Sequence, residues 1–310
     1  MSRQSRSLLQ VHGAVLLFGL PGLFGKLLPL SPAAIVFGRV ALAALALLGA
    51  SAVWKLPLRP RSGRRCLAFI ALGLLLAGHS TTFFQSVQVS GVAVAVIAFS
   101  SFPAFVALLE PLFFGQKPRL GDAVLAGFAL AGVAVLLPSL ESSNSTLQGV
   151  LWGVASSLLF ALLSLCNRQY VRQYSGITLA LYQDFFAAVA LLPFVLIRWP
   201  AFTIRDLFLL LVLGVLCTAV AHTLFITALR RIEARTASMI ACLEPVYGSV
   251  LAALFLSEEL SARVVVGGLM VLGVVLYATL NASKGKNEMA MQLEELEKTR
   301  DLRRIYGVQS

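Results

Sequence analysis

A few ionisable side chains interrupt long runs of apolar residues, and they are the residues of this sequence that could do chemistry. His79, His222 and Glu244 each lie near the middle of such a run. If the run crosses a bilayer, a charge there costs about 2.5–3.5 kcal/mol, so each residue needs a reason to be present. Glu244 precedes Pro245, and a proline frees a backbone carbonyl one turn back, which suits a pocket wall. A low dielectric disfavours the charged carboxylate, so Glu244 could carry a proton, or could simply be a neutral, hydrogen-bonded acid.

Aromatic side chains lie close to these polar residues at helical spacing. Phe83 shares a helical face with His79, and Tyr247 follows Glu244 by three positions. Together with Phe102, these rings could stack on a ring-bearing ligand. The two histidines could equally be hydrogen-bonded packing residues. We expect no metal and no cofactor, because no cysteine or carboxylate joins the histidines at ligand spacing.

Three further charged residues lie nearer the ends of their apolar runs. Arg39 is about 10 Å from one end of its run and Asp184 about 10 Å from the opposite end of its own. In a hydrocarbon core about 30 Å thick they differ in depth by roughly 10 Å, so we do not predict a direct ion pair. Arg39 is expected to face an outer vestibule or to bind helix-end carbonyls, and Asp184 to face an inner one. Lys26 either extends to the surface or binds a ligand carboxylate. The candidate binding residues are thus Lys26, Arg39, His79, Phe83, Phe102, Asp184, His222, Glu244 and Tyr247.

Other polar and sulfur-containing residues are interpreted as structural. Glu110 is expected to cap a helix or to pair with Lys117 or Arg119, and the side chain of Arg168 to extend to the membrane surface. The four cysteines have no metal-like spacing, so they are interpreted as small packing residues: Cys66, Cys166, Cys217 and Cys242.

Ten apolar runs, each long enough to cross a bilayer, must position these residues. Only 13% of the residues are charged, about half the fraction in a soluble domain. The ten-residue alternating segments of a β-barrel are absent. We therefore predict an all-α membrane protein with ten transmembrane helices. The expected spans are Leu8–Leu28, Pro32–Trp54, Cys66–Val87, Val92–Phe114, Leu120–Pro138, Leu147–Tyr170, Ile177–Ile197, Asp206–Leu229, Ala234–Leu256 and Ala262–Leu280.

Lysine and arginine are distributed unevenly between the two sets of loops. With the N-terminus placed inside, sixteen of the 25 lie at inner loops, and three, Arg198, Arg205 and Arg263, lie outside. Loops rich in basic residues stay in the cytoplasm. We therefore expect an integral protein of the bacterial inner (cytoplasmic) membrane with both termini in the cytoplasm. The net charge of +11 needs no nucleic-acid partner.

The second half of the chain weakly repeats the first. An offset of 142 residues places Pro103 on Pro245 and Gln116 on Glu258, and an offset of 143 places His79 on His222. We therefore predict a five-helix repeat at 1–140, a second repeat at 141–283 and a charged cytoplasmic tail at 284–310. Because five is odd, the second repeat is inverted relative to the first, as in proteins that open alternately to two sides of a membrane.

Three segments carry a resemblance to a known family. They read "LSPAAIVFGRV" at 30–40, "IACLEPVYGSVLAALFLSEELS" at 240–261 and "VVVGGLMVLGVVL" at 264–276. The sequence resembles the ten-helix, EamA-type branch of the drug/metabolite transporter superfamily. The family pattern has a proline followed about thirteen positions later by an acidic residue, here Pro245 and Glu258, whereas the first half departs from it at Gln116. The resemblance implies a single-chain secondary carrier with a central pocket, often an exporter of amino acids or other metabolites.

These observations favour a carrier that exports a small polar metabolite, most readily an amino acid or a related compound, by alternating access. We expect a midplane pocket built by the third, fourth, eighth and ninth spans, with contributions from the first, second, sixth and seventh, in a monomer or weak homodimer. Alternatives are a proton-coupled exporter of drugs or lipophilic cations and a nucleotide-sugar-type carrier. An enzyme is not expected, because the sequence has no nucleotide loop and no metal-ligand cluster.

Overall fold

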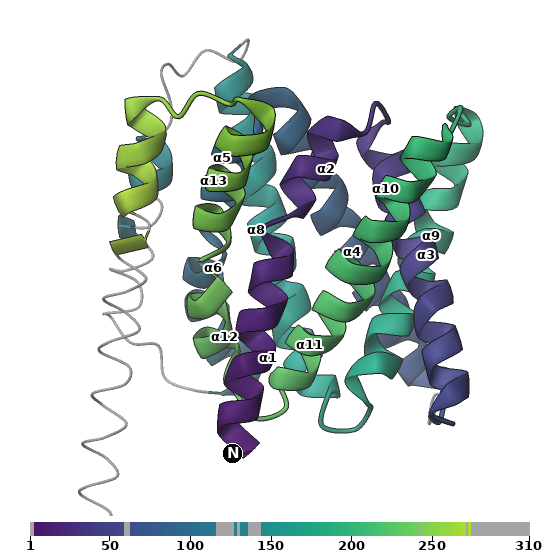
Figure 1. Cartoon of the computed structure of the whole chain (residues 1–310). Coiled ribbons are helices and arrows are strands. Elements are labelled where there is room, and N and C mark those ends of the chain that lie inside the picture. The colour runs from purple at the N-terminus through teal and green to yellow at the C-terminus, as the bar shows by residue number, and fades with distance from the viewer. Residues whose placement is uncertain are drawn as a thin grey trace, which may run out of the picture.

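A computed structural model describes residues 3–58, 63–115, 127–128, 131–135, 144–241, 243–270 and 272–273 (Figure 1). Its regular structure is helical, and eight stretches of the described chain are long and apolar enough to cross a membrane. These eight correspond to the first four and the sixth to ninth predicted spans. The predicted spans Leu120–Pro138 and Ala262–Leu280 lie largely outside the described residues, although 131–134 and 262–270 are helical. Gln116 and the tail at 284–310 also lie outside them.

The helices follow one another as a bundle in which several spans consist of two shorter pieces. In chain order they are α1 (Arg3–Phe18), α2 (Pro21–Leu27), α3 (Pro32–Val53), α4 (Gly63–Ser90), α5 (Val92–Phe99), α6 (Phe102–Phe114), α8 (Ser145–Tyr170), α9 (Gly176–Ile197), α10 (Ile204–Gly214), the π-helix η1 (Val215–Val220), α11 (Ala221–Ala228), α12 (Ala234–Ala241) and α13 (Glu244–Leu256).

Polar residues at the starts of the long helices explain where these helices begin. The side chains of Ser31, Asn144 and Ser175 accept hydrogen bonds from backbone N–H groups in the first turns of α3, α8 and α9. Thr203 and Asp206 form a reciprocal capping box at the start of α10. Each cap satisfies a donor that the helix itself leaves unpaired. The ends of the spans are therefore fixed by local sequence as well as by hydrophobicity.

Three spans break near their middle, and a proline stands at the start of each second half. Pro21, Pro103 and Pro245 occupy the first or second position of α2, α6 and α13. The break between α1 and α2 also brings Gly19 against α13, where a Cβ would lie 2.6 Å from the Cβ of Tyr247. A span that ends and restarts inside a bundle leaves backbone groups that are tolerated where they are buried or line a cavity.

The helices pair across the bundle in a repeated way. Helix α4 packs on α8, and α11 packs on α1, while α3 packs on α9. At the broken spans, α5 packs on α13 and α6 on α12. The first piece of one span therefore meets the second piece of the other, as in an antiparallel pair. Every one of these contacts joins the first half of the chain to the second.

Glu258, the acidic residue of the family pattern, caps a helix of the other half. The backbone N–H of Val92, the first residue of α5, donates to Oε2 of Glu258 at 3.1 Å. Gly91 precedes it with a φ of +96°, and a Cβ at this position would overlap the Glu258 carboxylate. A negative charge at a helix N-terminus is stabilising, so Glu258 holds α13 and α5 together.

Candidate functional site

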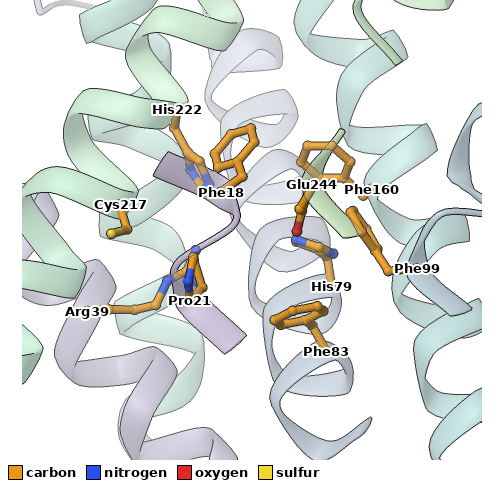
Figure 2. A pocket seen from close by; sticks show the side chains of 10 residues that line it. All are labelled: Phe18, Pro21, Arg39, His79, Phe83, Phe99, Phe160, Cys217, His222 and Glu244. Atoms are coloured by element: carbon orange, nitrogen blue, oxygen red, sulfur yellow. The ribbon is translucent and has the colours of Figure 1, made fainter. Parts of the chain in front are cut away.

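A cavity lies among the broken spans (Figure 2). Helices α1 to α5, α8, η1, α11 and α13 contribute to it. Its lining residues are Phe18, Pro21, Arg39, His79, Phe83, Phe99, Phe160, Cys217, His222 and Glu244.

The breaks in the spans place several of these side chains at the cavity. Phe18 ends α1, and Pro21 begins α2. Phe99 is the last residue of α5, and Glu244 is the first residue of α13. Cys217 lies in the π-helix. A π turn is often found at functional sites, because its extra residue changes the direction of side chains.

His79 is held in place by α8. Its Nδ1 lies 2.9 Å from the hydroxyl and 3.2 Å from the carbonyl oxygen of Ser156. The same hydroxyl donates to the His79 carbonyl oxygen at 3.0 Å. In Figure 2 the carboxyl group of Glu244 points toward the His79 ring. With Nδ1 occupied by Ser156, the other ring nitrogen of His79 is available to a ligand.

Each histidine contacts a phenylalanine from the opposite half of the chain. The His79 ring is 4.7 Å from that of Phe160, and the His222 ring is 5.6 Å from that of Phe18, measured between centroids. Phe18 and Phe160 are themselves 142 residues apart. These two contacts between a histidine and a phenylalanine are thus matched between the halves. The repeat offset would have identified these two phenylalanines from sequence.

Arg39 carries the permanent positive charge of the cavity lining. Its side chain is buried, and its guanidinium carbon lies 5.7 Å from the centre of the Phe84 ring. It interacts electrostatically with Asp184 and Glu244. No ion pair joins it to either residue within the described parts of the chain, and its Nε has no hydrogen-bond partner there. A buried guanidinium with an unpaired donor is suited to binding an anion.

Four predicted binding residues lie outside the cavity lining. Asp184 is fully buried in α9, and neither of its carboxylate oxygens has a hydrogen-bond partner among the described residues. It therefore faces no open vestibule, contrary to the prediction. Phe102 lies behind the wall, with its ring 5.6 Å from Phe99. Tyr247 packs near the α1–α2 break, and Lys26 is exposed, with its Nζ 3.5 Å from the Gln88 carbonyl oxygen.

Five of the predicted residues do come together at the cavity, namely Arg39, His79, Phe83, His222 and Glu244. The sequence analysis missed Phe18, Pro21, Phe99, Phe160 and Cys217. Cys217 was interpreted as a plain packing residue, and its spacing gave no other signal. Among the described residues, no group of three or more His, Cys, Asp or Glu side chains could hold a metal ion.

The prediction that Arg168 extends to the membrane surface was wrong, because Arg168 forms an ion pair with Glu110. Lys117 and Arg119, the predicted partners of Glu110, lie outside the described residues. The Arg168 guanidinium also lies over the Phe114 ring, 4.6 Å from its centre. Arg168 therefore joins α8 to α6 rather than extending freely to the membrane surface. Neighbours along the chain could not reveal this pair, because the two residues are 58 positions apart.

An all-helical bundle with apolar helices long enough to cross a membrane defines a polytopic membrane protein. The model of the EamA-like transporter family matches the chain twice, at residues 5–137 and 147–280. The chain belongs to this family. It is an integral membrane transporter and not an enzyme.

Known relatives agree with this assignment. An uncharacterized transporter of Bacillus subtilis, YwfM, is 28% identical over 272 residues, covering 84% of this chain and 90% of the relative. The S-adenosylmethionine uptake transporter of Rickettsia conorii is 26% identical over 227 residues, covering 72% and 75%. A solved crystal structure superposes with a TM-score of 0.71 at 16% identity over 91% of this chain and 99% of the other. This last likeness shows the fold alone.

Proposed function

We propose that this transporter moves a zwitterionic metabolite, an amino acid or an amino-acid derivative, through the cavity by alternating access. The observation that carries the proposal is the presence of Arg39 and Glu244 in one cavity walled by phenylalanine rings. The guanidinium suits a substrate carboxylate, and the Glu244 carboxylate suits a substrate ammonium group. The rings suit an apolar or planar remainder.

The charges of the lining make two alternative functions less favourable. Arg39 would repel a lipophilic cation, even though Glu244 and the phenylalanine rings could attract one. A nucleotide sugar needs several basic groups around its phosphates, whereas Arg39 is the one arginine or lysine among the lining residues. A molecule with one group of each sign matches the lining better than either.

The proposed mechanism uses two inverted repeats of five spans each, at 1–140 and 141–283, followed by a cytoplasmic tail at 284–310. Two observations support it. The family model matches once in each half, and the described helices pair across the halves in matching combinations. Rocking of one half against the other would then expose the cavity to each side of the membrane in turn.

The proposal also includes the direction of transport, the membrane in which the protein lies and its oligomeric state. We propose export across a bacterial cytoplasmic membrane, with both termini in the cytoplasm, by a monomer or weak homodimer. The distribution of basic residues supports this orientation. The Rickettsia relatives are named uptake transporters, so the direction of net flux needs a test other than the substrate screen.

A counterflow screen in liposomes tests the substrate class. Purified protein is reconstituted with unlabelled compound inside, and entry of labelled compound is followed at two pH values. The panel pairs amino acids with their amides and decarboxylated amines, and includes S-adenosylmethionine, which carries the same amino-acid group. We expect exchange of zwitterions and at least about tenfold weaker exchange of compounds lacking either charge. Equal exchange of a lipophilic cation panel, or no exchange of any zwitterion, would contradict the proposal.

A further inference from the structure

Three phenylalanine rings, two of which line the cavity, pack together beside it. The ring of Phe225, in α11, lies 5.8 Å from that of Phe18 and 5.6 Å from that of Phe160. Phe18 and Phe160 are 6.3 Å apart and meet edge to face. Such ring pairs are attractive beyond the area that they bury. The three rings therefore form one packed group that joins α1, α8 and α11.

This group lies on the side of the cavity where the chain begins. Helix α11 is at the same end of the bundle as the start of α1 (Figure 1). Phe225 is 2% exposed and is not a lining residue, whereas Phe18 and Phe160 do line the cavity. Phe225 thus packs behind these two rings, outside the cavity lining.

The residue that matches Phe225 in the first half is Phe83. The 142-residue offset that relates Phe18 to Phe160 also relates Phe83 to Phe225. Phe83 lines the cavity, and its ring contacts are with Phe84 and Phe99, at 5.7 and 5.8 Å.

Phe83 makes no ring contact with Phe18 or Phe160 within the described parts of the chain. In Figure 2 it lies across His79 from these two rings. Matching residues of the two halves therefore occupy different environments, one packed on the central pair and one facing the cavity.

We propose that Phe225 and Phe83 are alternate gate residues, which take turns packing against the Phe18–Phe160 pair. In the conformation seen here Phe225 closes the end where α1 begins, and Phe83 leaves the other end open to the cavity. In the opposite conformation Phe83 closes its own end, and Phe225 becomes part of the substrate site. This inference rests on the proposed alternating access and adds the residues that perform it.

The internal repeat gives a physical reason for Phe225 and Phe83 to exchange roles. Inverted repeats have two asymmetric states that are related by exchanging the roles of their halves. Phe18 and Phe160 map onto each other, so the central pair is the same in both states. Replacing Phe225 by Phe83 exchanges identical side chains, so the packing gained on one side resembles the packing lost on the other.

The native Cys217 provides a reporter for the test. It lines the cavity and is 1% exposed, so an impermeant thiol reagent reaches it only through an open end. With Cys66, Cys166 and Cys242 replaced by serine, the rate of Cys217 modification is measured from each face of oriented membrane vesicles. The ratio of the two rates reports which end of the cavity is open.

Truncating Phe225 and truncating Phe83 should shift this ratio of modification rates in opposite directions. Phe225→Ala weakens closure at the end where α1 begins, so modification from that face should rise relative to the other by about three- to tenfold. Phe83→Ala should shift the ratio the opposite way. Phe69→Ala is the matched control, because Phe69 is equally buried but packs on Tyr174 and Tyr182 away from the cavity. It should leave the ratio unchanged. Phe225→Leu and Phe83→Leu repeat the test with milder changes.

The possible outcomes distinguish a failure of the gate proposal from a failure of the proposed transport function. Shifts in the same direction, or no shift in either leucine variant, would overturn the gate. Zwitterion exchange without any shift would reject the gate and leave the proposed function standing. Opposite shifts in a protein that exchanges none of the zwitterions would support the gate and contradict the substrate class.

Discussion

At the scale of single residues, the cavity depends on Arg39 for its positive charge. A guanidinium offers a planar set of donors that can bind a carboxylate through two parallel hydrogen bonds, whereas an ammonium cannot. Its burial beside the Phe84 ring keeps it weakly hydrated. The identity of this side chain should therefore matter beyond its charge.

We predict that Arg39→Lys raises the KM for a zwitterionic substrate about tenfold and that Arg39→Gln abolishes measurable exchange. A lost bidentate interaction with a charged group is worth about 1.5–3 kcal/mol. The measurement is concentration-dependent counterflow in liposomes. Arg172→Gln, which removes an exposed arginine outside the cavity, serves as the control and should exchange like the wild type. Equal KM values for Arg39→Lys and the wild type would remove Arg39 from the substrate site.

Glu244→Gln tests the negative charge of the cavity without changing the size of the side chain. We predict at least about tenfold slower exchange of zwitterions, because an amide cannot pair with an ammonium group as a carboxylate does. The unfolding temperature in detergent should stay within a few degrees of the wild type. The same substitution should leave exchange of a carboxylate lacking the ammonium group unchanged. A uniform loss with both substrates would indicate a general defect instead.

His79→Ala should also impair flux without abolishing folding. The substitution removes a side chain that Ser156 orients and that Phe160 and Phe99 contact. His79→Asn keeps a hydrogen-bonding group near Ser156 and should recover part of the activity. Wild-type flux in His79→Ala would refute a role for this residue in transport.

Polarity explains which of the lining residues could be predicted from sequence. Arg39, His79, His222 and Glu244 stand out because charged and polar groups are costly in an apolar span. Phe18 and Phe160 are two of 20 phenylalanines, so hydrophobicity could not single them out. Asp184 gave the same signal as Glu244, but it is fully buried and does not line the cavity. Depth along a helix is readable from sequence, whereas the direction a residue faces depends on packing.

At the scale of the helices, the breaks in the spans were only partly predictable. A proline marked each of the interruptions at α2, α6 and α13, and Gly19 also marked the one at α2, as their backbone preferences require. The π-helix η1 in VLCTAV contains neither residue, so no local signal indicated it. The helix cap formed by Glu258 and the ion pair between Glu110 and Arg168 join distant parts of the chain. Only the three-dimensional arrangement could reveal them.

Glu258→Ala should destabilise the protein by about 0.5–2 kcal/mol, the usual cost of losing an N-terminal cap. The Val92 N–H would lose its acceptor, and α13 would lose a contact with α5. Thermal unfolding in detergent measures the effect. Glu259→Ala removes the adjacent, exposed glutamate and should leave the unfolding temperature unchanged. Equal unfolding temperatures for the two variants would contradict the capping role.

The close approach of α1 and α13 gives a second prediction at this scale. Gly19→Ala should lower both stability and flux, because the added Cβ would lie 2.6 Å from the Cβ of Tyr247. Gly49→Ala is the matched control in the interior of α3, where no other side chain lies within 4 Å of the new methyl group. There, alanine should be neutral or stabilise by about 0.5–1 kcal/mol. A similar loss in both variants would argue against a special contact at Gly19.

At the scale of the whole molecule, the number of spans determines where the two ends of the chain lie. Eight described stretches can cross the membrane, and two further apolar runs of the sequence give ten. Either even number returns the chain to its starting side, which we propose is the cytoplasm because of the distribution of basic residues. We predict that reporter fusions before Arg3 and after Ser310 both score as cytoplasmic.

A reporter inserted after Trp199, between α9 and α10, should give the opposite result, because seven proposed spans precede it. A cytoplasmic result at Trp199 would mean that an even number of spans precedes it. Because two of these, α8 and α9, belong to the second half, the first half would then have an even number of spans. The second repeat would have the same orientation as the first, and matching residues such as Phe83 and Phe225 would face the same end of the bundle. Two residues at the same end could not alternate as gates of opposite ends. The reporter after Trp199 therefore tests the inverted arrangement on which both the transport mechanism and the gate depend.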